Sequence, residues 1–287
     1  MHELLHSLEH SLLDCLKQLP LLFLSYVVVE YAEHRMSSKT KDMIYRAGKA
    51  GPLLGSLIGI IPQCGFSAAA AGFFAGGIIS PGTLIAVFLS TSDEMLPIMV
   101  SGGIAPGTIG RILLVKVLVG TIVGLAVDFA AERIRGPRKR MAEHLDLCEE
   151  ENCGCKEHGI VRSALHHTLH IGLFIFLISV VIGLGMEWFE ETVKLQQVMG
   201  IPGIGEAIAG LVGMIPNCAA SVLITQLYLS GLLAAGPLFA GLLCGAGTGL
   251  LVLYRVNHGR KQNLILTAVL YGSGVVAGAL LGVIGIL

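Results

Sequence analysis

The chain contains an internal repeat. Residues 59–89 align without a gap with residues 213–243 at a constant offset of 154, and ten of the 31 positions are identical. The shared core reads GIIPQCGFS in the first copy and GMIPNCAAS in the second. Because the same Pro-x-Cys element recurs within this long ungapped match, we interpret it as a duplication. The chain is therefore expected to fold as two related halves.

Both halves are strongly apolar. Of the 287 residues, 54% are hydrophobic and only 14% are charged, whereas roughly 25% are charged in an ordinary soluble domain. The charges are concentrated in a few short segments. The apolar stretches between them cover about residues 12–33, 51–101, 109–131, 166–188, 201–254 and 263–287. Since roughly 20 apolar residues span a bilayer as a helix, the sequence predicts an all-α polytopic membrane protein.

Lys and Arg residues predict the orientation of the two halves. Of the 19 in the chain, 15 lie in residues 34–50, 131–165 and 255–261. Cytoplasmic loops are enriched in these residues, so we expect the three segments in the cytoplasm and both termini on the outer side of the membrane. This topology gives each half an odd number of membrane crossings. The halves would then have opposite orientations, which is the inverted-repeat architecture of many transporters.

Each repeat is predicted to contain one interrupted helix pair. Residues 1–131 and 166–287 form the two repeats, and residues 132–165 form a cytoplasmic linker. A short apolar run of about ten residues ends at Pro62 or Pro216, and another begins just beyond it. Neither run alone spans roughly 30 Å, and proline disfavours helix at the residue before it, so we expect a broken, re-entrant pair. With three full transmembrane helices per repeat, this predicts about ten membrane segments.

These two breaks provide the first candidate site. Non-helical backbone at membrane depth is tolerated only where protein covers it or where it lines a cavity. A half-helix that begins at such a break points its amide groups into the cavity, and nearby side chains can add ligands. The candidate substrate-binding residues are Gln63, Cys64, Ser67, Asn217, Cys218 and Ser221. The alternative is that each proline only kinks its helix and that the cysteines are small buried residues.

The motif Ser-Thr-Ser-Asp-Glu at residues 90–94 is a second candidate, because it interrupts an apolar stretch. Acidic groups at membrane depth are costly and point to function. The candidates are Thr91, Asp93 and Glu94, whose carboxylates could bind a cation or carry a coupling proton. At the midplane, a metal would therefore be bound by Cys64, Cys218, Asp93 and Glu94. The alternative is structural, with Asp93 capping a helix or pairing with Arg111 or Lys116.

The linker holds a third candidate. Thiol and imidazole groups lie close together at Cys148, Cys153, Cys155 and His158. These ligands suit soft or borderline metal cations, so the segment could capture or sense a metal. The spacing is not that of a zinc finger, and the alternative is a solvated linker with incidental thiols.

The paired motifs IPQCGFS and IPNCAAS, together with STSDE and a central loop bearing Cys and His, resemble the ten-transmembrane heavy-metal exporter family. The resemblance covers essentially the whole chain and implies export of a heavy metal or metalloid. Members are similar to arsenic permeases and are described as arsenic efflux proteins or manganese transporters. The family's motifs fall on residues 62–67, 91–94 and 216–218. The linker has fewer histidines than the family pattern, which weakens its predicted role in metal capture.

We therefore expect a secondary active transporter of the inner membrane rather than an enzyme. The thiols of Cys64 and Cys218 favour trivalent arsenic or a soft cation, whereas Asp93 and Glu94 suit manganese, so both substrates stay open. A small anion bound at the half-helix N-termini and a passive channel are the alternatives. We expect no covalently bound cofactor, and a proton or sodium ion would drive transport. The expected partners are a small inorganic ion, the lipid bilayer and, in a homo-oligomer, further copies of the chain, but not nucleic acid.

Overall fold

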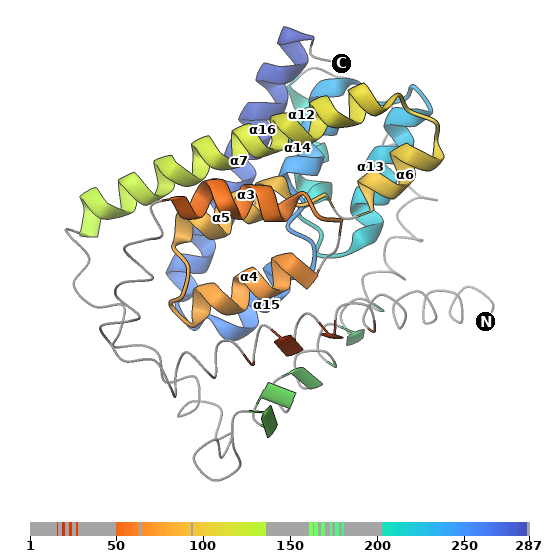
Figure 1. Ribbon diagram of the computed structural model, residues 1–287. Coiled ribbons are helices and arrows are strands. Elements are labelled where there is room, and N and C mark those ends of the chain that lie inside the picture. The colour runs from red at the N-terminus through yellow and green to blue at the C-terminus, as the bar shows by residue number, and fades with distance from the viewer. Residues whose placement is uncertain are drawn as a thin grey trace.

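The regular structure of the described residues is helical throughout (Figure 1). The computed structural model describes residues 50–135 except 63, 64 and 93, residues 203–285, and isolated positions within 16–27 and 161–180. The first half contains α3 (Gly51–Gly59), α4 (Gly65–Ala75), α5 (Pro81–Ser90), α6 (Met95–Ser101) and α7 (Pro106–Arg135). The second half contains α12 (Ile204–Gly213), α13 (Cys218–Leu229), α14 (Ala235–Cys244), α15 (Thr248–Val256) and α16 (Arg260–Ile284).

The helices of the two halves correspond one to one. α3 ends at Gly59 and α12 at Gly213, while α7 begins at Pro106 and α16 at Arg260, and both pairs of positions fit the offset of 154. The duplication recognised from residues 59–89 therefore extends to all the helices described in each half. The orientation of one half relative to the other across a membrane stays a prediction.

The halves exchange helices with each other. Within the first half α5 packs against α3 and α7, and within the second half α14 packs in the same way against α12 and α16. Between the halves, α4 packs against α15, and its counterpart α13 packs against α6, the counterpart of α15. In Figure 1 the pair of α4 and α15 lies below α5, and the pair of α13 and α6 lies to the right of α14. The packing between the halves is therefore reciprocal, with equivalent helices of each half contacting the other half.

Glycines allow the two long helices, α7 and α16, to approach the central helices α5 and α14 closely. A Cβ atom built on Gly124 of α7 would lie 2.6 Å from the carbonyl oxygen of Gly82 in α5. A Cβ atom on Gly278 of α16 would lie 2.6 Å from the backbone nitrogen of Ala240 in α14. Small residues are typical of close helix packing in membranes, where van der Waals contact stabilises helix association. The two glycines occupy equivalent positions of the two repeats.

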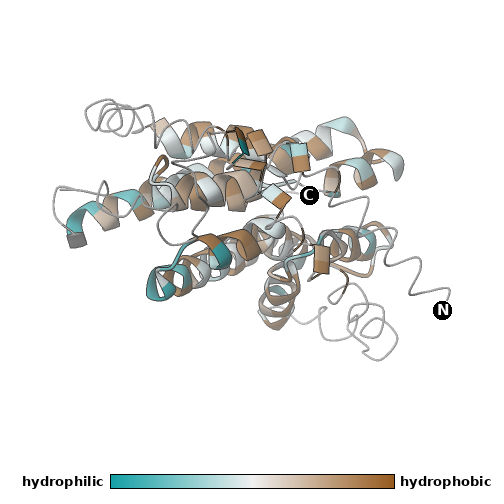
Figure 2. Ribbon diagram, turned by 90° about the horizontal axis from the view of Figure 1, so that it is seen from below, coloured by the Kyte–Doolittle hydropathy of each residue, from teal (hydrophilic) through white to brown (hydrophobic). Residues whose placement is uncertain are grey.

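Four segments of the described chain are long and apolar enough to cross a membrane. They are Pro81–Ser101, Pro106–Arg133, Ala235–Val256 and Arg260–Ile284. The first and third are 71% and 89% buried, whereas α7 and α16 are each 28% buried, so the interrupted segments lie inside and the long helices outside. Large apolar side chains such as Leu114, Leu118 and Ile122 are exposed along α7. Figure 2 shows hydrophobic residues along most of the helical segments, with hydrophilic residues gathered towards some helix ends.

Each half contains one helix interruption that was predicted and one that was not. The predicted break separates α3 from α4, and α12 from α13, around Pro62 and Pro216. A second break separates α5 from α6, and α14 from α15, where the sequence predicted a continuous transmembrane helix. These segments are apolar on average, so their hydropathy does not reveal the break. The break depends on a few hydroxyl-bearing and glycine residues at the centre of each segment.

Candidate functional site

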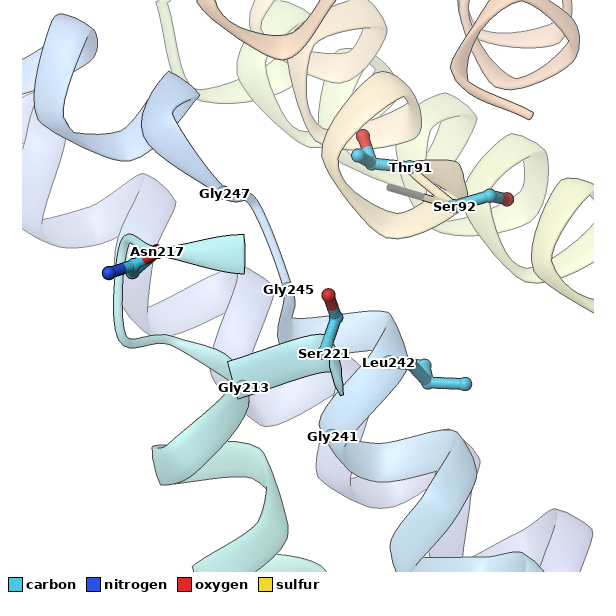
Figure 3. Close-up of a pocket in the computed structure, with 9 residues that line it drawn as sticks. All are labelled: Thr91, Ser92, Gly213, Asn217, Ser221, Gly241, Leu242, Gly245 and Gly247. Carbon is cyan, nitrogen blue, oxygen red and sulfur yellow. The ribbon is translucent and has the colours of Figure 1, made fainter. Parts of the chain in front are cut away.

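A small pocket lies where helix ends from the two halves meet (Figure 3). It is lined by Thr91, Ser92, Gly213, Asn217, Ser221, Gly241, Leu242, Gly245 and Gly247. These residues come from three interruptions: between α5 and α6, between α12 and α13, and between α14 and α15. Figure 3 shows Thr91 and Ser92 on the first-half side, opposite the second-half segments that carry Ser221 and Gly245. The pocket therefore forms only when both halves are in place.

Hydroxyl groups end α5 at the pocket. The Ser90 hydroxyl donates to the carbonyl of Ala86 at 2.8 Å, and the Thr91 hydroxyl donates to the carbonyl of Val87 at 2.7 Å. Such side-chain bonds take up carbonyls of the last helical turn and compete with continuation of the helix. Thr91 itself adopts φ −53° and ψ 127°, which is outside the helical region. The chain turns out of the helix at this point, and α6 begins four residues later.

Glycines end α14 at the equivalent position of the second repeat. Gly247 adopts φ 53° and ψ −144°, a conformation that side chains with a Cβ rarely reach. Gly245, the counterpart of Thr91, leaves the helix with ψ 85°. The helix thus ends at the same position in both repeats for different reasons. Hydroxyl groups end it in the first repeat, and the conformational freedom of glycine ends it in the second.

The N-terminus of α13 faces the pocket. Asn217 has an extended conformation and caps the helix, since its side-chain oxygen accepts from the backbone N–H of Ala219 at 3.3 Å. Ser221 lies one turn further along the same helix and also lines the pocket. The first backbone N–H groups of a helix have no partner within it and carry partial positive charge. This helix end can therefore bind an electronegative atom of a substrate.

A lysine is buried directly behind the pocket wall. Lys116 of α7 is 0% exposed. Its Nζ atom donates to the carbonyl of Thr91 and, at 2.8 Å, to the carbonyl of Leu242. Both acceptors belong to pocket-lining residues, one from each half. The sequence suggested Lys116 only as a partner of Asp93, although a lone lysine within the apolar stretch 109–131 is itself a signal of function.

The family model described as "Putative, 10TM heavy-metal exporter" matches residues 21–206. The chain belongs to this family. The match confirms the resemblance found from the sequence and supports, with the apolar helices, a multi-pass membrane protein of the heavy-metal exporter class. No curated protein and no solved structure matches the chain. Within the matched range lie most of the first repeat, with its Pro-x-Cys and Thr-Ser-Asp-Glu motifs, and the start of α12.

For this exporter-family chain, three of the residues predicted as substrate ligands meet in the pocket: Thr91, Asn217 and Ser221. Ser67 does not line it; this residue is buried, and its backbone carbonyl lies against Gly249 of α15. Glu94 also lies outside the lining and stands at the start of α6, where its side chain makes no capping hydrogen bond. The pocket includes Ser92 and the glycines of α12 to α15, which sequence reasoning had not selected.

Several predicted ligands lie outside the residues that the structure describes. They are Gln63, Cys64 and Asp93, the side chain of Cys218, and the linker residues Cys148, Cys153, Cys155 and His158. Across the described ranges, no group of three or more His, Cys, Asp or Glu residues is placed to hold a metal ion. The midplane metal site and the linker metal site both stay predictions.

Proposed function

We propose that this protein is a secondary active transporter that exports a heavy metal or metalloid across the inner membrane. The substrate would be an arsenic species or a divalent cation such as manganese. The observation that carries the proposal is the pocket between the halves, which is built from three interrupted helices. Broken helices at membrane depth are tolerated where they line a cavity, and secondary transporters of this architecture bind substrate at such breaks.

The pocket offers oxygen atoms to a substrate. The Thr91 hydroxyl donates to the carbonyl of Val87, and the Ser92 hydroxyl donates to the carbonyl of Ser90 at 3.3 Å. Because a hydroxyl has one donor and two lone pairs, both oxygens keep acceptor capacity. Such acceptors can bind the hydroxyl groups of trivalent arsenic or the hydrated shell of a divalent cation. In this proposal Cys64 and Cys218 add thiol ligands, which favours arsenic.

Transport would follow from the two-half construction. Each half supplies part of the pocket lining, and α4 and α13 are exchanged between the halves. A movement of one half against the other would therefore open the pocket first to one side of the membrane and then to the other. A proton or sodium gradient would drive the cycle, with the Lys- and Arg-rich linker in the cytoplasm.

A small anion is the second candidate substrate, and the N-terminus of α13 favours it. This helix N-terminus and its capping Asn217 lie at the pocket, and helix N-termini bind anions. The two candidates differ in their need for thiols. An anion transporter would work without Cys64 and Cys218, whereas export of trivalent arsenic would require them.

The test is elemental analysis of cells challenged with arsenic, manganese, zinc, cobalt or iron. Cells with the wild-type protein should hold less of one element than cells with an empty vector, and the Cys64→Ala/Cys218→Ala variant should restore the content. Ser92→Ala should weaken export by about 2- to 10-fold, the effect of one hydrogen bond of about 0.5–1.5 kcal/mol. Ser101→Ala is the matched control, because this exposed hydroxyl bonds only to the carbonyl of Ile98 in its own helix.

The outcomes separate the candidates. Unchanged content of all five elements would rule out metal export and direct attention to inorganic anions. Normal export by the double cysteine variant, with export lost in Asn217→Ala, would favour anion recognition at α13. Flux that persists after the proton and sodium gradients are collapsed would identify a passive channel.

A further inference from the structure

Lys116 is a buried, charged residue that the proposed function leaves unused. It lies on α7, on the side turned away from lipid, and its side chain is fully buried. Its neighbours Leu114 and Leu118 on the same helix are 60% and 52% exposed. A lysine within a membrane span is costly and is kept mainly where it serves function.

Two backbone carbonyls that accept from Lys116 belong to the ends of two half-helices. Thr91 is the C-cap of α5, and Leu242 lies in the last turn of α14. Carbonyls at a helix C-terminus have no partner within the helix and carry a partial charge of about −0.5 per helix end. An ammonium group close to two such ends is therefore favoured electrostatically. Lys116 joins them across the boundary between the halves.

Carboxyl groups from α7 and α12 lie at the N-terminal ends of α5 and α14. At α5, Asp128 accepts from the Ser80 hydroxyl at 2.6 Å and from the backbone N–H of Gly82 at 2.9 Å. At α14, the Glu206 carboxylate lies against Gly236 in the first turn, 2.6 Å from a Cβ built there. A carboxyl group thus lies at the N-terminus of both α5 and α14, and Lys116 lies at the C-termini of both.

The fold does not require a cation at this position. The repeat offset of 154 places Leu270 of α16 where α7 has Lys116, and Leu270 is also 0% exposed. An apolar side chain therefore packs a long helix against a central one equally well. The ammonium is specific to the first repeat, where its acceptors are the wall of the pocket.

Carbonyl groups of unwound segments and half-helix C-termini are the ligands that hold a coupling Na⁺ in secondary transporters. We propose that Lys116 is a tethered cation that fills such a carbonyl site between α5 and α14. The protein then binds no Na⁺ there and is not driven by a sodium gradient. This inference rests on the proposed transport function and narrows its coupling ion.

The test measures sodium binding and thermal unfolding of the purified full-length protein in detergent. The salts are NaCl, KCl and N-methyl-D-glucamine chloride at equal ionic strength, and binding is followed with radioactive sodium. Lys116→Ala vacates the site, Lys116→Met fills it without charge, and Arg111→Ala removes an exposed charge from the same helix as the control. The assay contains no heavy metal, so a wrong substrate for export would leave its result intact.

The wild type and Arg111→Ala should unfold at the same temperature in all three salts and should bind no sodium saturably. Lys116→Ala should unfold at a lower temperature in N-methyl-D-glucamine chloride, recover in Na⁺ or K⁺, and bind sodium saturably. Lys116→Met should be destabilised without recovery in any salt.

Saturable sodium binding by the wild type, or a Lys116→Ala variant that is indifferent to the salt, would overturn the proposal. If Lys116→Ala does not fold in any of the salts, the sodium-binding measurement on the wild type tests the proposal, and saturable binding there overturns it. A failure of either kind would still leave export itself to be judged by the elemental analysis.

Discussion

Gly124→Ala tests the close packing of α7 on α5. The added Cβ would lie 2.6 Å from the carbonyl oxygen of Gly82, 2.9 Å from Cβ of Pro52 and 3.0 Å from Cβ of Ala86. None of these atoms can rotate away, because one belongs to the backbone and the others are attached directly to it. α7 must therefore move away from α5 by several tenths of an ångström, which also loosens the contact around Lys116.

The steric cost follows from comparison with a matched glycine. Overpacking of a well-packed interface typically costs about 1–3 kcal/mol, whereas Ala for Gly in a helix gains up to about 1 kcal/mol. Gly110 of α7 is exposed, and a Cβ there would meet nothing within 4 Å. Since Gly110→Ala has the same propensity gain without the clash, the difference between the two variants isolates the steric cost. We expect Gly124→Ala to be less stable than Gly110→Ala by about 1–3 kcal/mol.

Unfolding in mixed detergent micelles, followed by circular dichroism during titration with a denaturing detergent, measures this difference. A difference of about 1.4 kcal/mol corresponds to a tenfold change in the unfolding equilibrium. Gly124→Ala with the stability of Gly110→Ala, or above it, would refute the packing argument. Export should fall together with stability, because the displaced α7 carries Lys116.

Two further predictions concern polar and glycine residues of the central helices. Asp128→Ala should destabilise the protein by about 1–3 kcal/mol, because the first turn of α5 loses two hydrogen bonds. Glu132→Ala, which removes an exposed carboxylate one turn later on α7, should have little effect. Equal losses of stability for the two variants in detergent unfolding would contradict the capping role of Asp128. Gly247→Ala should cost about 1–3 kcal/mol, because φ 53° with ψ −144° is strained for alanine, and should also impair export, because Gly247 lines the pocket. Gly272→Ala, where a Cβ meets nothing within 4 Å, is its control, and a fully active, stable Gly247→Ala variant would contradict the assigned backbone conformation.

Much of the helix order could be predicted from the sequence. The repeat offset of 154 locates corresponding helices in both halves, and the prolines at 62 and 216 mark one break in each. The second break was missed, because residues 84–100 are apolar enough for a continuous helix. Its cause is the bonding of Thr91 to its own helix and the backbone of Gly247, which depend on individual residues rather than on average hydropathy.

The sequence by itself determined the duplication, the apolar segments and the breaks at proline, because each depends on local composition and chain chemistry. Thr91, Asn217 and Ser221 were also selected from their motifs. Only the tertiary structure decided that α4 and α13 are exchanged between the halves, that the three breaks enclose one pocket, and that Lys116 reaches Leu242. These features join residues that are far apart in the chain, and such contacts are set by helix packing, which local sequence patterns do not encode.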